Sequence, residues 1–361
     1  MKNFTCEQGT NFVDMLQCSS INRGKGTQDQ HNKTLTHLSI YLATKSRKWP
    51  PKPCVALSLL IFVLLSQKTL AKPTDDHDHK HDSFEFIQYL EGCHKGQNVS
   101  GLQELKKHLT KFGYFNYDHS KHADNDEFDD LLESAIKSYQ KSYHLKVTGS
   151  LDTTTAKQMM VPRCGVPDVV NGTRKGSKKY NRKLKSLHGV SHYEFFPGPL
   201  RWPSTQTHLR YRFASSARQV PGTENVRSIC AQAFQRWAQV TTFTFEEVPS
   251  TSAADITIGF HRGNHGDRSP FDGFKGTYAH ANPPGGGNFH FDAYETWSAN
   301  PGPNEIDLES VSVHEIGHLL GLNHSPDLPD AIMYPYFEYG MVKRDLNRDD
   351  IDGIRALYGL Q

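Results

Sequence analysis

Two histidines and a glutamate stand at helical spacing near the C-terminal end of the chain. His314 and His318 are four residues apart, so a helix places both imidazoles on one face, with Glu315 beside the first. Imidazoles at this spacing can hold one zinc ion, and the carboxylate can act as general base toward a water molecule. Gly321 allows the helix to end in a left-handed conformation, so that His324 can turn back as a third ligand. Three neutral ligands leave one coordination position open, which predicts a catalytic zinc site.

The same residues resemble a known family of proteases. The stretch from His314 to His324 reads HEIGHLLGLNH and is similar to the metzincin signature H-E-x-x-H-x-x-G-x-x-H. Met333, in the sequence AIMYP, resembles the methionine of the turn that follows this signature in the family. Ser325, directly after the third histidine, resembles the matrixin branch. Few chains of this composition contain the pattern by chance, so histidines buried for purely structural reasons are a weak alternative.

A second match lies upstream, at residues 162–168. These residues read PRCGVPD and resemble the cysteine switch of matrix metalloproteinase propeptides. The resemblance implies that Cys164 occupies the open zinc position in a latent form, because a thiolate is a better zinc ligand than water. It also implies that Arg163 and Asp168 pair and shape the switch loop. A small buried thiol, or a disulfide with Cys93, is the alternative interpretation of Cys164.

The region from His261 to Trp297 also resembles the matrixin catalytic domain, which binds a structural zinc and calcium. The resemblance implies a structural zinc site formed by His265, Asp267, His280 and His290. It implies a calcium site formed by the side chains of Asp272, Asp292 and Glu295 and the carbonyls of Gly273, Lys275 and Thr277. A further calcium site of the family would use Asp255 and Asn288, where a neutral amide replaces an acid. Calcium prefers oxygen donors, although a solvated acidic loop would have the same composition.

The composition describes a globular chain of more than one domain. Its 361 residues include 41 basic and 39 acidic ones, with 22% charged and 36% apolar residues. These values exclude a highly charged disordered chain and a polytopic membrane protein. From Tyr193 to the end, acidic residues outnumber basic ones, which excludes an electrostatic surface for nucleic acid.

One strongly apolar run, Cys54–Leu65, follows several basic residues and precedes the small residues Thr69 and Ala71. This pattern predicts a signal peptide cleaved after Ala71, and therefore secretion. The run is shorter than the roughly 20 residues of a membrane-spanning helix. A signal anchor that tethers the protein is the alternative, so residues 1–71 are assigned to an N-terminal extension with a signal peptide or signal anchor. The three cysteines left after cleavage include Cys93, with no assigned role, and Cys230, expected in a core.

The rest of the chain divides by its periodicity and charge. Helical spacing from Phe84 to Met160 predicts a small helical domain, with one apolar face formed by Leu131, Ala135, Ile136, Tyr139 and Tyr143. The resemblance implies that residues 72–168 are a helical propeptide. A basic stretch without acids predicts an exposed linker at residues 169–192. Residues 193–361 would form the catalytic domain, with an amphipathic helix at 226–237 and strands at 209–213, 242–247 and 255–260.

With the resemblance, these patterns predict an α+β protein. A small three-helix propeptide, similar to peptidoglycan-binding domains, would precede a metzincin catalytic domain with a twisted mixed five-stranded sheet and three helices. The segment FFPGPLRWP at residues 195–203 looks most like that of plant-type secreted matrix metalloproteinases without a haemopexin domain. We expect a monomer that requires two zinc ions and one or more calcium ions.

The resemblance implies a latent, zinc-dependent endopeptidase that hydrolyses extracellular matrix or cell-wall proteins. Substrate would lie along an edge strand near Tyr278 and Ala279. A bulky apolar residue after the scissile bond would enter a pocket walled by Pro335 and Phe337, the latter usually a tyrosine in the family. Partners would be protein or peptide substrates and an activating protease, without nucleic acid or a stable membrane span after processing.

A non-catalytic zinc module that binds matrix components is the rival hypothesis. Such a module has no use for Glu315 as a general base or for a thiol switch at Cys164. Two further acids, Asp349 and Asp350, resemble residues of which one pairs with the new N-terminal amine after activation. Two solvated acids at a helix N-terminus are the alternative.

Overall fold

The structure, a computed structural model, describes residues 82–115, 124–169, 191–198, 200–214 and 220–361. The described residues all belong to one compact unit, residues 78–361. The apolar run Cys54–Leu65 and most of the basic linker lie outside them. Within the described ranges, no helix combines the length and apolar character needed to span a bilayer.

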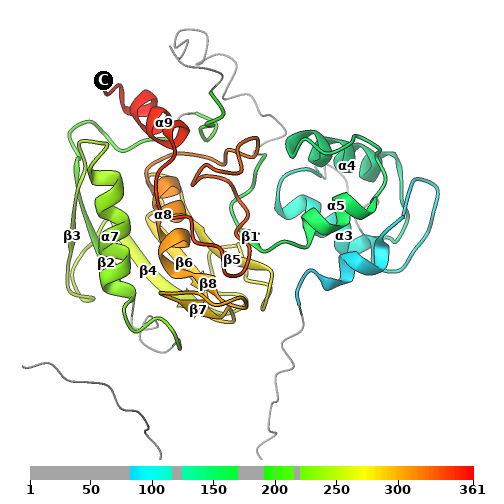
Figure 1. The fold of residues 1–361 in the computed structure, drawn as a ribbon, viewed down its shortest axis with the longest axis horizontal. Coiled ribbons are helices and arrows are strands. Elements are labelled where there is room, and N and C mark those ends of the chain that lie inside the picture. Colours follow the sequence, from blue (N-terminus) through cyan, green and yellow to red (C-terminus); the bar gives the residue numbers. More distant parts are fainter. Residues whose placement is uncertain (1–81, 116–123, 170–190, 199, 215–219) are drawn as a thin grey trace, which may run out of the picture. The chain divides into compact units, whose positions relative to one another are not determined.

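The described residues between 82 and 169, here called the helical part, contain one 3-10 helix and three α-helices. These are η1 (Glu85–Leu90), α3 (Leu102–Lys111), α4 (Asp130–Ser142) and α5 (Thr153–Met159), which gather together in Figure 1. Asp129 and Asp152 cap α4 and α5, because their carboxylates accept hydrogen bonds from the first-turn N–H groups of Leu132 and Thr155. The prediction of three helices is confirmed.

The apolar face of α4 differs by one position from the prediction. Ala135, Ile136 and Tyr139 are buried as expected, but Leu131 is 51% exposed and Leu132 is fully buried in its place. Residues 132, 136 and 139 follow each other at intervals of four and three, so Leu132 lies closer to the centre of the face. Leu131 is turned about 100° away from it.

Residues 191–361, here called the sheet part, contain most of a six-stranded mixed sheet. Its order is β1-β5-β6-β4-β2-β3, and only β5 and β6 pair antiparallel. The strands are β1 (Arg163–Cys164), β2 (His208–Phe213), β3 (Thr244–Glu247), β4 (Ile256–His261), β5 (Thr277–Ala281) and β6 (Asn288–Asp292). The sheet part contributes the five strands predicted for the catalytic domain, and β1, from the helical part, adds a sixth at the β5 edge. A small second sheet pairs β7 (Trp297–Ser298) with β8 (Ile306–Asp307).

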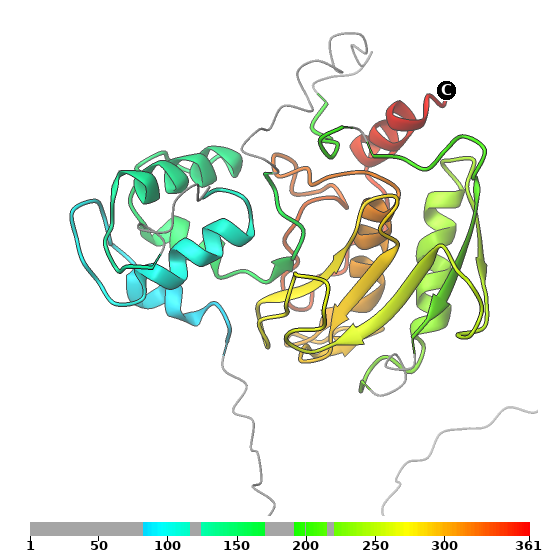
Figure 2. The ribbon, with the colours of Figure 1, turned by 180° about the vertical axis from the view of Figure 1, so that it is seen from behind.

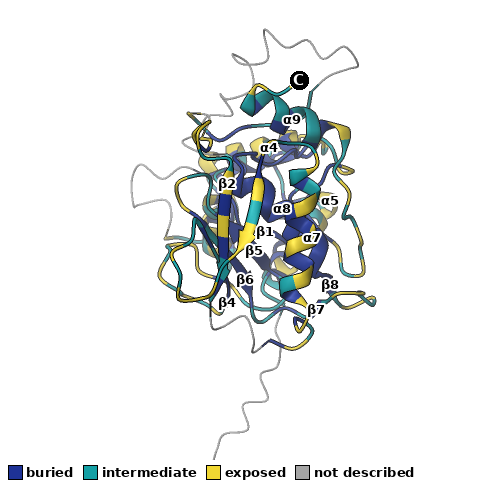
Figure 3. Cartoon of the chain, turned by 90° about the vertical axis from the view of Figure 1, so that its left-hand side faces the viewer, coloured by how far each residue is buried: buried dark blue, intermediate teal, exposed yellow. Residues whose placement is uncertain are grey.

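Two helices pack on one face of the large sheet, as the front and back views show (Figures 1 and 2). They are α7 (Val226–Ala238) and α8 (Leu308–Leu319), joined by a 2.9 Å hydrogen bond from the Trp237 indole to the Val313 carbonyl. Every residue of α8 is buried, whereas α7 also presents exposed positions (Figure 3). A helix buried on all sides can hold polar side chains away from bulk water. The last helix, α9 (Arg348–Tyr358), begins with a capping box at Asn347.

Candidate active site

Three histidines converge at the end of α8. His314 and His318 lie one turn apart on the helix, and His324 follows it. The Nδ1 atoms of His314 and His318 donate to the carbonyls of Ile332 and Leu322, at 2.7 and 2.8 Å. Since the protons are on Nδ1, each Nε2 presents a lone pair to the others. His318 Nε2 lies 3.1 Å from each of the other two Nε2 atoms.

This donor set fits zinc. Tetrahedral zinc with bonds of about 2.0–2.1 Å to nitrogen and about 2.3 Å to sulfur places two nitrogens about 3.3 Å apart, and sulfur about 3.5 Å from nitrogen. The Cys164 Sγ lies 3.5 Å from His318 Nε2, and all four donor atoms lie within 4.8 Å of one another. All four residues are buried, and burial lowers the pKa of His314, His318 and His324. The neutral imidazoles are the form that binds metal.

Gly321 and Met333 position this group. Gly321 has a φ of +105°, and a Cβ there would lie 2.3 Å from the Leu200 carbonyl oxygen, so only glycine fits the turn. Met333 packs against α8 at Gly317, where a Cβ would lie 2.3 Å from its sulfur. The backbone N–H groups of Ile332 and Met333 donate to Asp350, at 2.8 and 3.1 Å. The sequence did not indicate this role of Asp350, because the contact joins α9 to the turn at Met333, which approaches it only in the folded chain.

Asp349 has different partners from its neighbour. Its Oδ1 accepts a 2.8 Å hydrogen bond from the backbone N–H of His192. The two adjacent acids are therefore not equivalent: Asp350 holds the turn at Met333, and Asp349 lies beside the first residues of the sheet part. Pairing of one of them with a new N-terminal amine stays a prediction.

Cys164 enters the site on β1. The strand lies between β5 and the segment Pro335–Phe337, because Cys164 N–H donates to Pro335 O at 2.9 Å and Gly165 N–H donates to Ala279 O at 2.8 Å. Phe337 N–H donates in turn to Pro162 O at 3.3 Å. The structure describes Cys93, Cys164 and Cys230 as free thiols, which contradicts the alternative of a disulfide between the first two. Cys230 is buried in the core, as predicted.

A buried ion pair supports the switch loop. Arg163 donates to both carboxylate oxygens of Asp168, at 2.6 and 3.0 Å, and its guanidinium lies 3.8 Å from the ring centre of Phe112. Asp168 also accepts from Tyr114 and Tyr143. Burial alone would raise the pKa of Asp168, but the Arg163 charge and the hydrogen bond with His324 hold it well below its usual value. The pair predicted from the resemblance is thus present, with further partners that the sequence did not indicate.

Glu315 is fully buried next to the three histidines. Neither of its carboxylate oxygens accepts a hydrogen bond from a nitrogen or oxygen donor in the described ranges. Burial raises the pKa of Glu315 to about 8. A carboxylate with a raised pKa in a water-poor site has the properties of a general base.

Four residues form a second cluster of metal donors. Asp267 Oδ2 lies 2.7 Å from His280 Nε2, 2.9 Å from His290 Nδ1 and 3.0 Å from His265 Nε2. The four donor atoms lie within 4.8 Å of one another. The structure therefore brings together the complete set predicted for a structural zinc, although loops and two strands supply its members. His261 also stacks on His265, at 4.9 Å between ring centres, and was not predicted.

Comparisons with known proteins agree with this geometry. Residues 201–359 match the matrixin family, and residues 98–159 match a putative peptidoglycan binding domain. Metalloendoproteinase 2-MMP of Arabidopsis thaliana is 46% identical over 281 residues, which cover 74% of this chain and 73% of that protein. The chain belongs to the matrixin family.

Two other relatives support this assignment. Metalloendoproteinase 1 of Glycine max is 42% identical over 312 residues, which cover 85% of this chain and 96% of that protein. Matrix metalloproteinase-16 of Rattus norvegicus is 41% identical over 243 residues, covering 64% of this chain and 37% of that protein. The matrixin is thus a metalloendopeptidase of the plant type, in a family that depends on zinc, and it acts on proteins or peptides.

The predicted calcium ligands of this matrixin lie in a loop before β5 and at the end of β6. Asp292 and Glu295 are buried, and Asp292 Oδ2 has no hydrogen-bond partner in the described ranges. Burial raises the pKa of Asp292 to about 8 and that of Glu295 to about 7. Ionising these buried carboxylates costs free energy, which a bound cation would offset, so the residues fit a cation site. The carboxylate oxygens of Asp272, Asp292 and Glu295 do not form one group within 4.8 Å of one another. In the described ranges, the groups that meet this criterion are the one with Cys164 and the one with Asp267.

The residues predicted for a further calcium site already have protein partners. Asp255 accepts from the Gln206 amide at 3.0 Å and from the Arg210 backbone N–H at 2.7 Å. Asn288 begins β6 and pairs with Thr257 of β4. A further calcium site at these residues stays a prediction.

The predicted pocket wall lies beside the matrixin histidines. Phe337 is buried, with its ring centre 5.5 Å from that of His314 and 5.7 Å from that of Tyr278. The Tyr278 hydroxyl donates to Pro335 O at 2.9 Å, which ties the wall to the edge strand. An apolar wall is therefore positioned next to the candidate zinc site.

Proposed function

We propose that the chain is the latent form of a secreted zinc endopeptidase that its own propeptide inhibits. Residues 1–71 direct secretion, residues 72–168 are the propeptide, residues 169–192 are a cleavable linker and residues 193–361 are the catalytic domain. One observation carries the proposal: β1 adds to the β5 edge and presents Cys164 Sγ to the three histidines. A peptide in this position occupies the groove that an extended substrate needs.

In the active form, His314, His318 and His324 would hold the catalytic zinc. Zinc at such a site supplies Lewis acidity toward water and toward the scissile carbonyl. Glu315 accepts the proton of the attacking water and then delivers it to the leaving amine. The buried position of Glu315 supports this role, since burial favours the protonated form and makes the carboxylate basic near neutral pH.

The substrate would replace β1 along β5. Its backbone would take the hydrogen bonds that Gly165 makes with Ala279 and that Cys164 makes with Pro335. The side chain after the scissile bond would point to the wall formed by Pro335 and Phe337. We propose a preference for a bulky apolar side chain there, because Phe337 presents only carbon atoms.

The remaining ions would stabilise the catalytic domain. His265, Asp267, His280 and His290 would hold a structural zinc, and the loop containing Asp272 would bind calcium. Calcium at millimolar concentration suits an extracellular protein, which agrees with the predicted signal peptide. Extracellular matrix or cell-wall proteins are the proposed substrates.

The test follows cleavage of a quenched peptide with Leu after the scissile bond, using recombinant residues 72–361. Activity should appear only after treatment with a thiol-reactive mercurial, and a zinc chelator should remove it. Metal analysis of the same sample should give two zinc ions per chain. Folded protein that keeps both zinc ions, stays inactive after mercurial treatment and cleaves no member of a peptide library would contradict the proposal and favour a zinc-binding module.

A further inference from the structure

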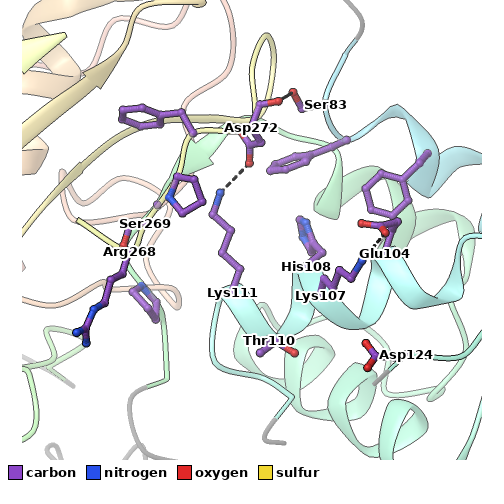
Figure 4. Close-up of a pocket in the computed structure, with 16 residues that line it drawn as sticks. Ser83, Glu104, Lys107, His108, Thr110, Lys111, Asp124, Arg268, Ser269 and Asp272 are labelled. Carbon is purple, nitrogen blue, oxygen red and sulfur yellow. Dashed lines mark hydrogen bonds and ion pairs between the residues drawn. The ribbon is translucent and has the colours of Figure 1, made fainter. Parts of the chain in front are cut away.

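The helical part also contacts the loop from Asp272 to Thr277 (Figure 4). The Ser83 hydroxyl donates to the Asp272 carbonyl at 2.7 Å, and Ser83 N–H donates to the Phe274 carbonyl at 2.8 Å. Arg163 N–H donates to the Gly276 carbonyl at 3.0 Å. These three carbonyls alternate along the loop with those predicted to bind calcium, which belong to Gly273, Lys275 and Thr277. The backbone contacts of the propeptide and of calcium therefore use different carbonyls.

One side-chain contact of the propeptide, in contrast, involves a predicted calcium ligand. Lys111, the last residue of α3, donates to Asp272 Oδ2 at 2.8 Å and to the Thr277 hydroxyl at 2.7 Å. The Thr277 hydroxyl donates in turn to the same Asp272 oxygen at 2.9 Å. The propeptide thus places an ammonium group on a carboxylate predicted to bind calcium.

The charges around the loop show why this contact matters. Two carboxylates meet at neighbouring amides of this loop, because Thr277 N–H donates to Asp272 Oδ1 at 2.7 Å and Gly276 N–H donates to Glu295 Oε1 at 3.4 Å. Glu295 is buried, as is Asp292 at the end of β6. Calcium would supply two positive charges to these carboxylates, whereas Lys111 supplies one, to Asp272. A cation and an ammonium beside the same carboxylate repel each other.

An open path leads to the contact. A pocket of about 860 Å³ lies between the two parts and is lined by Lys111, Asp272 and Ser83 among other residues (Figure 4). Lys111 and Asp272 are about a quarter exposed, at 26% and 25% of their side chains. A hydrated cation can reach Asp272 without unfolding either part.

We propose that Lys111 makes propeptide docking and calcium binding oppose each other. Lys111 weakens calcium binding in the zymogen. Calcium weakens the binding of the propeptide to the catalytic domain by the same factor, since coupling between two sites is reciprocal. Calcium thereby favours release of the propeptide in an extracellular setting. The inference rests on the proposed function, because it requires a calcium site in the loop and an inhibitory propeptide.

The first test measures calcium affinity by titration calorimetry on the intact zymogen carrying Glu315→Ala, which prevents self-cleavage. Lys111→Met should bind calcium roughly three- to tenfold more tightly, the range expected for removing one partly exposed like charge. Lys107→Met is the matched control: it removes the same charge from α3, but Lys107 pairs with Glu104 on its own helix. Asp292→Asn removes a predicted calcium ligand, so the heat of binding that this variant loses comes from the predicted calcium site. Circular dichroism verifies that each variant is folded.

The second test measures the reciprocal effect. Calcium should accelerate labelling of Cys164 by a thiol reagent in the parent zymogen, and Lys111→Met should abolish this acceleration while Lys107→Met retains it. Equal calcium affinity in the parent and Lys111→Met, or equal acceleration in both, would overturn the inference and leave the protease assignment intact. If no variant binds calcium at the loop, the calcium part of the proposed function fails, and the inference fails with it. Lys111→Gln, which keeps a hydrogen-bond donor, provides a second variant if Lys111→Met does not fold.

Discussion

Asp168 and His324 are joined by a 2.7 Å hydrogen bond, although 156 residues separate them in the sequence. The Nδ1–H of His324 donates to the carboxylate of Asp168, and both side chains are about 1% exposed. This bond places the proton on Nδ1 and leaves Nε2 free to face His318. A residue of the helical part therefore orients one of the three candidate zinc ligands. The same carboxylate neutralises Arg163, so one side chain links the switch loop to the metal site.

Asp168→Ala should weaken latency. The substitution leaves the Arg163 guanidinium buried without its partner, which typically costs about 3–5 kcal/mol in the docked state. Labelling of Cys164 by a thiol reagent should therefore accelerate by roughly tenfold or more. The exposed Asp130, on the outer side of α4, provides the control through Asp130→Ala. Equal labelling rates for Asp168→Ala and the parent would contradict this role.

Tyr139→Phe should produce a smaller effect of the same kind. The hydroxyls of Tyr139 and Tyr336 lie 2.7 Å apart and are buried between the two parts. Loss of one hydroxyl should weaken docking by about 0.5–1.5 kcal/mol, the usual net value of such a bond. Less mercurial should then suffice for activation, while the mature enzyme keeps its activity, because Tyr139 lies in the proposed propeptide. Tyr89→Phe, at a tyrosine that is 77% exposed, should change nothing.

Glu315→Ala should abolish proteolysis without releasing metal. A general base contributes roughly 10²–10⁴ to the rate, and the three histidines do not depend on it for their hydrogen bonds. Peptide cleavage after mercurial treatment and zinc content are measured on one sample. Undiminished cleavage would show that another group activates the water.

His108 should make the helical part sensitive to acid. Its ring is buried between Phe84 and Phe112, and its Nε2 has no hydrogen-bond partner in the described ranges. Burial lowers the pKa of His108 to about 3, whereas the unfolded value is near 6.5. The folded state therefore excludes the proton that the unfolded state binds, and its contribution to stability is lost as the pH falls from about 6.5 toward 3.

His108→Leu should remove this part of the acid sensitivity. Urea unfolding of the zymogen between pH 7 and 4 would compare the slopes, and the variant should lose up to about 1.4 kcal/mol per pH unit of the parent's dependence. His94→Leu, at an exposed histidine, is the control. Parallel pH curves for the parent and His108→Leu would show that His108 does not contribute.

Features that depend on residues within one or two helical turns could be predicted from the sequence. The pairing of His314 with His318 follows from helix geometry. The left-handed Gly321 belongs to the same class. The switch residues Arg163, Cys164 and Asp168 were indicated only by resemblance to a family.

Other features depended on contacts between distant segments, which local spacing does not record. The sixth strand forms because β1 pairs with the edge of β5, which is distant from it in the sequence. The roles of Asp350 and Lys111 come from a turn and a loop that approach them only in the folded chain. The sequence by itself determined which side chains could bind metal, because that depends on their chemistry. The tertiary structure decided which of them meet, because burial and backbone pairing between remote segments bring their donor atoms together.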